Sequence, residues 1–312
     1  MHSTDKDLAL LKAASGRRSF LVKTGIAAAG FTSLGLLAAP AIAREFSLRH
    51  DDDDRHDNDD KNADTAQQIF TAALIAEGLA TTMYYNSLVG GVIQDPNLAG
   101  PGGTLDNPAS LANVGYLQGA LSEEIVHANL LRELTGGTTA SKDPVQTFYF
   151  PTGTFDNLAN FLPILLALEN AFIGAYLTSV HEFSLMAAKL EPFEHEQKDP
   201  SGKPYKRREL AYFAQVASSI QGVESEHRAL ARAIPSISPG NTVFAGINVF
   251  PADNLNYEQT DGLNSVYNGA HSAVAALTPF ITPGQGKTAF SFSTALASAP
   301  SVDVPTTGGL PQ

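Results

Sequence analysis

The stretch "GVESEHRALARAI", from Gly222 to Ile234, follows an apolar run and is rich in Ala, Leu and Arg, which predicts a helix. It places Glu224 and His227 three residues apart, and this spacing puts both side chains on one face of the helix. Taken alone, such a pair is typical of a solvated helix surface. An interior position would require partners from other parts of the chain.

Three earlier segments have the same helical character, and each also carries a glutamate among apolar residues. The four predicted helices cover residues 65–88, 108–134, 158–189 and 209–234. Asp64 or Thr65 is suited to cap the first of them. Pro163 lies near the start of the third, where it marks either the first turn or a kink. Four long helices joined by sizeable linkers predict an all-α fold, a four-helix bundle.

The four predicted helices contribute, in order, Glu, Glu-x-x-His, Glu and Glu-x-x-His. These residues are Glu77, Glu124, His127, Glu169, Glu224 and His227. A lone buried carboxylate costs several kcal/mol, and four of them on facing helices would repel one another. Two divalent cations would balance the four charges, and each neutral histidine would add a nitrogen ligand. The pattern therefore predicts a site for two metal ions.

The chain also contains an internal repeat. When Glu77 is aligned with Glu169, tyrosine recurs seven residues on and serine ten residues on. When Glu124 is aligned with Glu224, histidine, leucine and arginine recur at the third, sixth and eighth positions. The matched pairs are Tyr84 with Tyr176, Ser87 with Ser179, His127 with His227, Leu130 with Leu230 and Arg132 with Arg232. We therefore expect two copies of one helical hairpin, which face each other around a pseudo-twofold axis.

From Thr65 to Ile234 the chain resembles the ferritin-like superfamily, and more closely the exported ferritin-like proteins related to plant desiccation-related proteins. The resemblance places the six Glu and His residues at the family's ligands to two iron or two manganese ions. It implies a redox function towards O₂, peroxide or Fe(II), of ferroxidase, peroxidase or catalase type, in oxidative or desiccation stress. The long linkers and an exported location depart from iron storage in a ferritin-type shell.

A non-catalytic function is the alternative. In that interpretation the helices form a stress-protective or interaction protein without metal, and the buried carboxylates pair with His127, His227, Arg132 and Arg232. The acidic linker and the C-terminal region would then be the working surfaces.

Tyr84 and Tyr176 lie two turns beyond Glu77 and Glu169, on roughly the same helix faces. They are suited either to donate hydrogen bonds to the metal ligands or simply to fill the core. The remaining acidic and histidine residues are expected to lie outside the ligand set. Glu123 and Glu226 neighbour the ligands, His181 and Glu182 form a surface pair, and His195 and His271 are structural.

Residues 1–43 resemble a twin-arginine export signal, with Arg17 and Arg18, an apolar run and a small-residue cleavage pattern that ends at Ala43. The alternative is an N-terminal membrane anchor that is retained. We expect cleavage, export by the twin-arginine machinery and a periplasmic or secreted protein that does not bind a membrane. The chain has no cysteine, so a metal ion would be held by Glu, Asp and His alone.

Residues 44–64 form an acidic run without apolar periodicity, which predicts a disordered linker in which His50 and His56 bind metal weakly at most. The net charge of −12 argues against nucleic acid as a partner and leaves metal ions and small oxidants. The predicted bundle covers 65–239, and an irregular extension covers 240–312, with a fifth helix within 263–280 and a strand near Phe290 and Phe292. The sequence does not decide between a monomer and a homo-oligomer.

Overall fold

The computed structural model describes residues 63–103, 112–137, 139–190, 193, 195–234, 263 and 265–298. The described chain is mostly helical, which confirms the all-α prediction. The predicted signal segment and almost all of the predicted acidic linker lie outside these residues. The helices are α2 (Ala66–Val89), α3 (Ala112–Leu134), α4 (Leu158–Ala188), α5 (Arg207–Ala233), α7 (Ala273–Ile281) and α8 (Phe292–Ser298). Two 3₁₀ turns, η3 (Gly91–Gln94) and η4 (Ala140–Lys142), and two strands, β1 (Thr147–Pro151) and β2 (Lys287–Ser291), complete them.

The ends of the long helices follow from local side-chain chemistry. Thr65 and Gln68 form a capping box at the start of α2, so the predicted cap is confirmed. The Asn157 side chain caps α4 by accepting a hydrogen bond from the backbone N–H of Asn160. Pro163 lies inside α4, beyond its first turn, and the helix continues past it.

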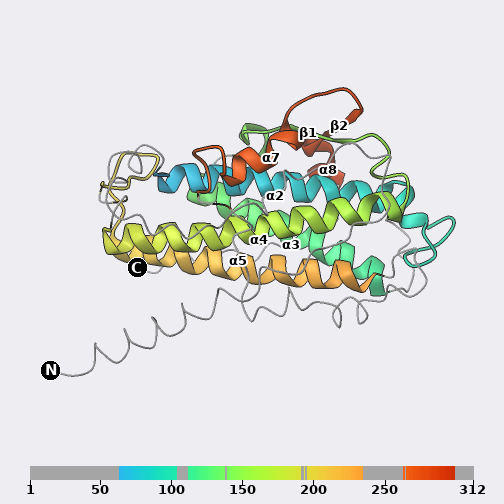
Figure 1. Ribbon diagram of the computed structural model, residues 1–312, viewed down its shortest axis with the longest axis horizontal. Helices are drawn as coiled ribbons and strands as arrows, with labels where there is room; N and C mark the ends of the chain where they lie inside the picture. The colour runs from blue at the N-terminus through green and yellow to red at the C-terminus, as the bar shows by residue number, and fades with distance from the viewer. Residues whose placement is uncertain are drawn as a thin grey trace, which may run out of the picture. The chain divides into compact units, whose positions relative to one another are not determined.

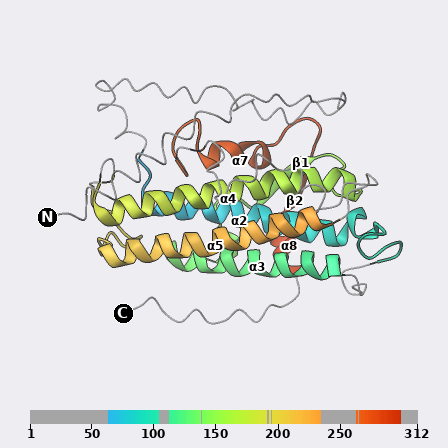
Figure 2. The ribbon, with the colours of Figure 1, turned by 60° about the horizontal axis from the view of Figure 1, so that its bottom comes forward.

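The four long helices run along a common axis, as both views show (Figure 1, Figure 2). The side chain of Gln67, near the start of α2, donates to the carbonyl of Leu134 at the end of α3, so these two helices are antiparallel. Phe70 of α2 packs on Phe183 near the end of α4, so α2 and α4 are also antiparallel. It follows that α3 and α4 point the same way, and the segment between them crosses the length of the helices.

The crossing segment carries a strand where only a loop was expected. β1 pairs antiparallel with β2, and the register joins Thr147 to Ser291 and Pro151 to Lys287. The pair lies over α2 (Figure 1). A Cβ at Gly78 of α2 would lie 3.3 Å from the Phe148 ring, so the glycine allows β1 to pass close to the helix. The strand expected near Phe290 and Phe292 is β2, which contains Phe290 but ends at Ser291, because Phe292 begins α8.

The described part of the C-terminal region, 263 and 265–298, contains regular elements. It supplies α7, which overlaps the second half of the predicted fifth helix and ends one residue beyond it, and also β2 and α8. Leu277, Phe280 and Phe292 belong to the same apolar core as Phe148 of β1. This layer explains why 18 residues of the 24-residue α2 are buried, since the helix is covered on two sides.

Helix α4 is long and apolar enough, by length and composition alone, to cross a membrane, and in the described chain it is a core helix. More than half of its most apolar stretch is buried inside the protein. Its partner α5 packs along it. The apolar character of α4 is therefore accounted for by packing between helices.

The interior consists of two apolar clusters placed end to end along the long helices. On α3 the boundary falls between Ile125 and Ala128, and on α5 between Ile220 and Ala231. Both Glu-x-x-His motifs lie at this boundary. The fold thus places a charged layer between two apolar cores, midway along the helices.

Candidate metal centre

All six predicted residues are buried side by side in this layer. Their exposed fractions are 1% for Glu77, 0% for Glu124, 8% for His127, 0% for Glu169, 1% for Glu224 and 1% for His227. Each of the four long helices supplies its members, in the order that the sequence predicts. We call these six residues the Glu/His cluster.

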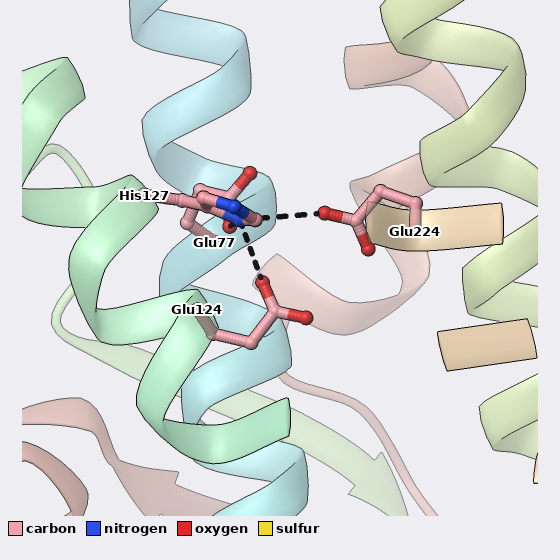
Figure 3. Close-up of side chains that lie close together, drawn as sticks. All are labelled: Glu77, Glu124, His127 and Glu224. Carbon is pink, nitrogen blue, oxygen red and sulfur yellow. Dashed lines mark ion pairs between the residues drawn. The ribbon is translucent and has the colours of Figure 1, made fainter. Parts of the chain in front are cut away.

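The imidazole of His127 forms the centre of one half of the cluster. Its Nδ1 lies 3.3 Å from Oε2 of Glu77, 3.6 Å from Oε1 of Glu224 and 3.8 Å from Oε2 of Glu124. Figure 3 shows these side chains converging from three helices on the His127 ring. One potential ligand atom from each of the four residues lies within 4.8 Å of the others, so the group could hold a metal ion.

The second half is built in the same way around His227. Its Nδ1 lies 3.1 Å from Oε1 of Glu124 and 3.4 Å from Oε2 of Glu224. Glu169 completes a second group of four whose ligand atoms lie within 4.8 Å of one another. Glu124 and Glu224 belong to both groups, and we call them the shared carboxylates. Glu77 with His127 is the His127 half-site, and Glu169 with His227 is the His227 half-site. This division is the one that the internal repeat predicts.

The cluster leaves an unusual number of buried polar atoms without a hydrogen-bond partner. Among the described residues there are eleven such side-chain atoms, and eight of them belong to the Glu/His cluster. They are Oε2 of Glu77, both carboxylate oxygens of Glu124 and of Glu224, Oε2 of Glu169, and Nδ1 of His127 and of His227. A buried polar group without a partner costs about 1–3 kcal/mol. A set of oxygen and imidazole nitrogen atoms facing one another fits iron, manganese or another divalent cation.

The electrostatics of the metal-free cluster favour extra protons. Burial, and then the charge of neighbouring carboxylates, raises the pKa of Glu124, Glu169 and Glu224. Burial alone would lower the pKa of His127 and His227, but the surrounding carboxylates raise both. Metal binding therefore competes with protons for these groups.

Two tyrosines connect the halves of the cluster. The Tyr84 hydroxyl of α2 donates to Oε1 of Glu169 on α4 at 2.5 Å, and the Tyr176 hydroxyl of α4 donates to Oε1 of Glu77 on α2. Burial raises the pKa of both hydroxyls, so both remain neutral donors. The structure thus favours hydrogen bonding to the cluster over simple core filling.

Two residues beside the cluster were not predicted to take part. Oε2 of Glu123 lies 2.8 Å from Nε2 of His227, on the outer side of that ring, so Glu123 is outside the ligand set as expected but contacts a ligand. Tyr116 donates to the backbone carbonyl of His227 at 2.6 Å. No local sequence pattern indicates either contact, because both cross from α3 to α5.

The metal-free alternative loses one of its expected pairings. Arg132 forms a buried ion pair with Asp143, with 2.6 Å between Nη2 and Oδ2. This arginine is therefore engaged with the segment that follows α3, and the carboxylates of the cluster do not have it as a partner. His127 and His227 do face those carboxylates, as both interpretations require.

The predicted surface pair of His181 and Glu182 is half wrong. His181 is exposed, whereas Glu182 is buried at 4% exposure. Helical periodicity explains the difference, since adjacent residues lie about 100° apart around α4. His195 and His271 are both exposed and lie outside the cluster, and His50 and His56 lie outside the described residues.

No protein-family model, curated protein or solved structure matches this chain. The resemblance to the ferritin-like superfamily therefore stays a prediction. What stands independently of it is a buried group of four glutamates and two histidines that could hold metal.

Proposed function

We propose that the chain is a ferritin-like protein, related to the desiccation-related proteins of plants, whose Glu/His cluster holds two divalent ions of iron or manganese. In this proposal the twin-arginine signal directs it to the periplasm or the cell exterior. There it acts on O₂, peroxide or Fe(II) in oxidative or desiccation stress.

The single observation that carries the proposal is the set of eight buried cluster atoms that face one another without a hydrogen-bond partner. A purely structural ion-pair network would satisfy its oxygens with arginine, lysine or backbone N–H groups. Here the ion pairs of the shared carboxylates Glu124 and Glu224 among the described residues are with histidine nitrogens, and Glu124 also contacts the Glu77 carboxyl group. Two divalent ions would supply the four positive charges that the four carboxylates lack.

The side chains of this protein would hold and orient such ions. The shared carboxylates lie within reach of both positions, while Glu77 and Glu169 each serve one. Tyr84 would orient Glu169 and Tyr176 would orient Glu77, because each hydroxyl donates to Oε1 of the carboxylate. Oε2 of each carboxylate has no hydrogen-bond partner and could bind an ion. The two apolar cores on either side exclude water. Iron or manganese held in this way supplies electron transfer to and from small oxidants.

The proposal is tested by metal analysis of the full-length chain expressed with its own signal and purified from the periplasm. We expect close to two iron or manganese ions per chain. An optical or EPR spectrum of the native protein then identifies which metal is bound. The double variant Glu77→Gln, Glu169→Gln should lose most of the metal, whereas Glu226→Gln, an exposed residue on α5, should retain it. Less than about one ion per chain, even after anaerobic reconstitution, would reject the proposal.

The same variants separate the redox function from the non-catalytic alternative. If the protein protects cells against peroxide or drying through its metal, the Glu77→Gln, Glu169→Gln variant loses protection together with metal. If the protein protects through its surfaces, this variant loses metal and keeps protection. Thermal unfolding of each variant verifies that the helices remain folded in both experiments.

A further inference from the structure

The two halves of the Glu/His cluster have equal ligands but unequal surroundings. Glu123 contacts the outer nitrogen of His227, and the residue that corresponds to Glu123 in the second repeat, one hundred positions later, is Val223. Tyr116 holds the backbone of His227, and its counterpart is Val216. The outer polar groups of the His227 half-site are therefore replaced by valines at the repeat positions that serve the His127 half-site.

The Glu123 carboxylate acts on the chemistry of the His227 ring. When Nε2 carries the hydrogen and donates it to Glu123, Nδ1 keeps its lone pair and directs it towards the shared carboxylates. The hydrogen bond also fixes the ring plane and makes Nδ1 a stronger donor to a cation. Removal of such an outer partner typically weakens metal binding by about 10- to 100-fold.

A second tyrosine contact lies on the same side of the cluster. The Tyr116 hydroxyl oxygen lies 3.3 Å from that of Tyr84, which donates to Glu169 at 2.5 Å. Each hydroxyl has one hydrogen, which Tyr116 donates to the His227 carbonyl and Tyr84 to Glu169, so the two tyrosines pack side by side and each holds one residue of the His227 half-site. The Tyr84 ring also packs edge-on against the His227 ring, with 5.7 Å between centroids.

The two half-sites also differ in their access to solvent. His127 is 8% exposed, whereas His227 is 1% exposed. An ion beside His127 can exchange with solvent more easily, and its ligands are held by fewer polar contacts.

From these differences we infer that the two metal positions are unequal. The His227 half-site binds a resident ion first and tightly, and the His127 half-site binds an exchangeable ion. Glu123 is the positioning residue that sets the difference. This inference rests on the proposed two-metal function, and it assigns the exchangeable position as the one at which a metal ion could enter, leave or act as substrate.

The test is an anaerobic titration of the metal-free full-length chain with Mn²⁺, in which EPR measures the free ion and calorimetry measures the heat. The wild type should show two classes of one ion each, separated by at least about tenfold. Glu123→Gln should weaken the tight class by about 10- to 100-fold and leave the weak class in place. Val223→Glu, which restores the missing carboxylate to the second repeat, should tighten the weak class and narrow the separation. Glu226→Gln serves as the control and should change neither.

The possible outcomes separate this inference from the proposed function. Two equal Mn²⁺ sites in the wild type, or an equal loss at both sites in Glu123→Gln, would overturn the inference and leave the two-metal function standing. Absence of Mn²⁺ binding, and of iron in the metal analysis above, would reject the proposed function and the inference with it. Because the Glu123 side chain is 53% exposed, its substitution should leave the fold intact. General destabilisation would weaken both classes together, so selective loss of the tight class identifies a positioning function.

Discussion

The protein buries carboxyl groups in two places and treats them in opposite ways. In the Glu/His cluster, four glutamates face two histidines, and eight polar atoms have no hydrogen-bond partner. Near one end of the helices, Asp64 and Glu182 are also buried, but Asp64 accepts hydrogen bonds from three backbone N–H groups. These come from Val266 and Tyr267 at 2.7 Å each and from Asn268 at 2.8 Å.

Glu182 has a raised pKa, as Glu124 of the cluster does, so the contrast lies in the backbone donors to Asp64. Burial, and then the charge and hydrogen bond of Asp64, raises the pKa of Glu182 to about 9. Amide dipoles and one proton therefore stabilise most of this pair, and only Oε2 of Glu182 is left without a hydrogen-bond partner. Among the described residues, no backbone N–H group donates to a cluster carboxylate, and the cluster could hold a metal ion instead.

Removal of metal should have the largest effect, because only the Glu/His cluster is proposed to bind it. A ligand present at one hundred times its Kd stabilises the fold by about 2.7 kcal/mol, so two ions contribute about 5 kcal/mol. We expect chelation to lower the free energy of unfolding by about this amount, which calorimetry or urea denaturation can measure. The Asp64→Asn variant should lose the same increment on chelation, because its site has no part in metal binding. If chelation left the stability of the purified, metal-containing protein unchanged, the cluster would not differ from the Asp64–Glu182 pair in the way we describe.

The pH dependence of stability gives the next largest effect. The pKa of Glu182 is near 4.5 when unfolded and about 9 when folded, so the folded protein binds the extra proton between these values. Its contribution to stability is therefore complete below about pH 4 and declines as the pH rises to about 9, by up to about 1 kcal/mol per pH unit. Glutamine is always neutral, so Glu182→Gln should gain stability over the wild type steadily from pH 5 to pH 9. Urea denaturation across this range measures the gain, and a constant difference between the two proteins would contradict the prediction.

The two sites differ in how well the sequence predicted them, because their contacting residues lie at different separations along the chain. Glu124 and His127 could be assigned because one helix carries both and apolar residues surround them. The repeat then placed Glu224 and His227 opposite them. In contrast, Glu182 stands next to His181 and has the sequence pattern of a surface pair. Its partner Asp64 lies near the start of the described chain, far from Glu182 in the sequence. No local pattern indicates that contact.

The fold shows the same limit. Helical periodicity predicted the four long helices to within a few residues, because it is a local property. It did not predict β1, whose partner β2 begins at Lys287, 136 positions beyond Pro151 in the register. It also did not predict the contact of Glu123 with His227, since that requires the relative rotation of α3 and α5. Contacts within one helix were predictable, and contacts that depend on packing between helices were not.

Two single substitutions should have opposite signs if the comparison is correct. In the metal-free protein, Glu124→Gln replaces a carboxyl group whose charge is disfavoured by burial and by Glu77 with a neutral amide, and we expect a gain of about 1–3 kcal/mol in the free energy of unfolding. Asp64→Asn puts an amide where three backbone N–H groups need an acceptor, and we expect a loss of about 1–3 kcal/mol. Chemical denaturation in the presence of chelator measures both. Destabilisation by Glu124→Gln without metal would indicate a structural ion-pair network in the cluster.

The metal-loaded protein should reverse the first of these signs. There Glu124 is a shared carboxylate, so Glu124→Gln should weaken both metal positions and lower the stability relative to the wild type. The same substitution is then stabilising without metal and destabilising with it. A structural carboxylate such as Asp64 cannot show this reversal, because its partners are backbone N–H groups in either state.

Substitution of the two tyrosines should have the smallest effect, and it compares the two half-sites of the cluster with each other. Tyr176→Phe removes the hydroxyl that donates to Glu77, and Tyr84→Phe removes the one that donates to Glu169. Each loss should weaken the binding of one ion by about 1 kcal/mol, which is roughly fivefold in affinity. Mn²⁺ titration should assign the Tyr84→Phe effect to the tight class and the Tyr176→Phe effect to the weak class. Tyr85→Phe, at a half-buried position on α2 next to Tyr84, is the matched control. Equal effects of both cluster variants on both classes would mean that the hydroxyls serve the layer as a whole, as buried polar groups do in a core without metal.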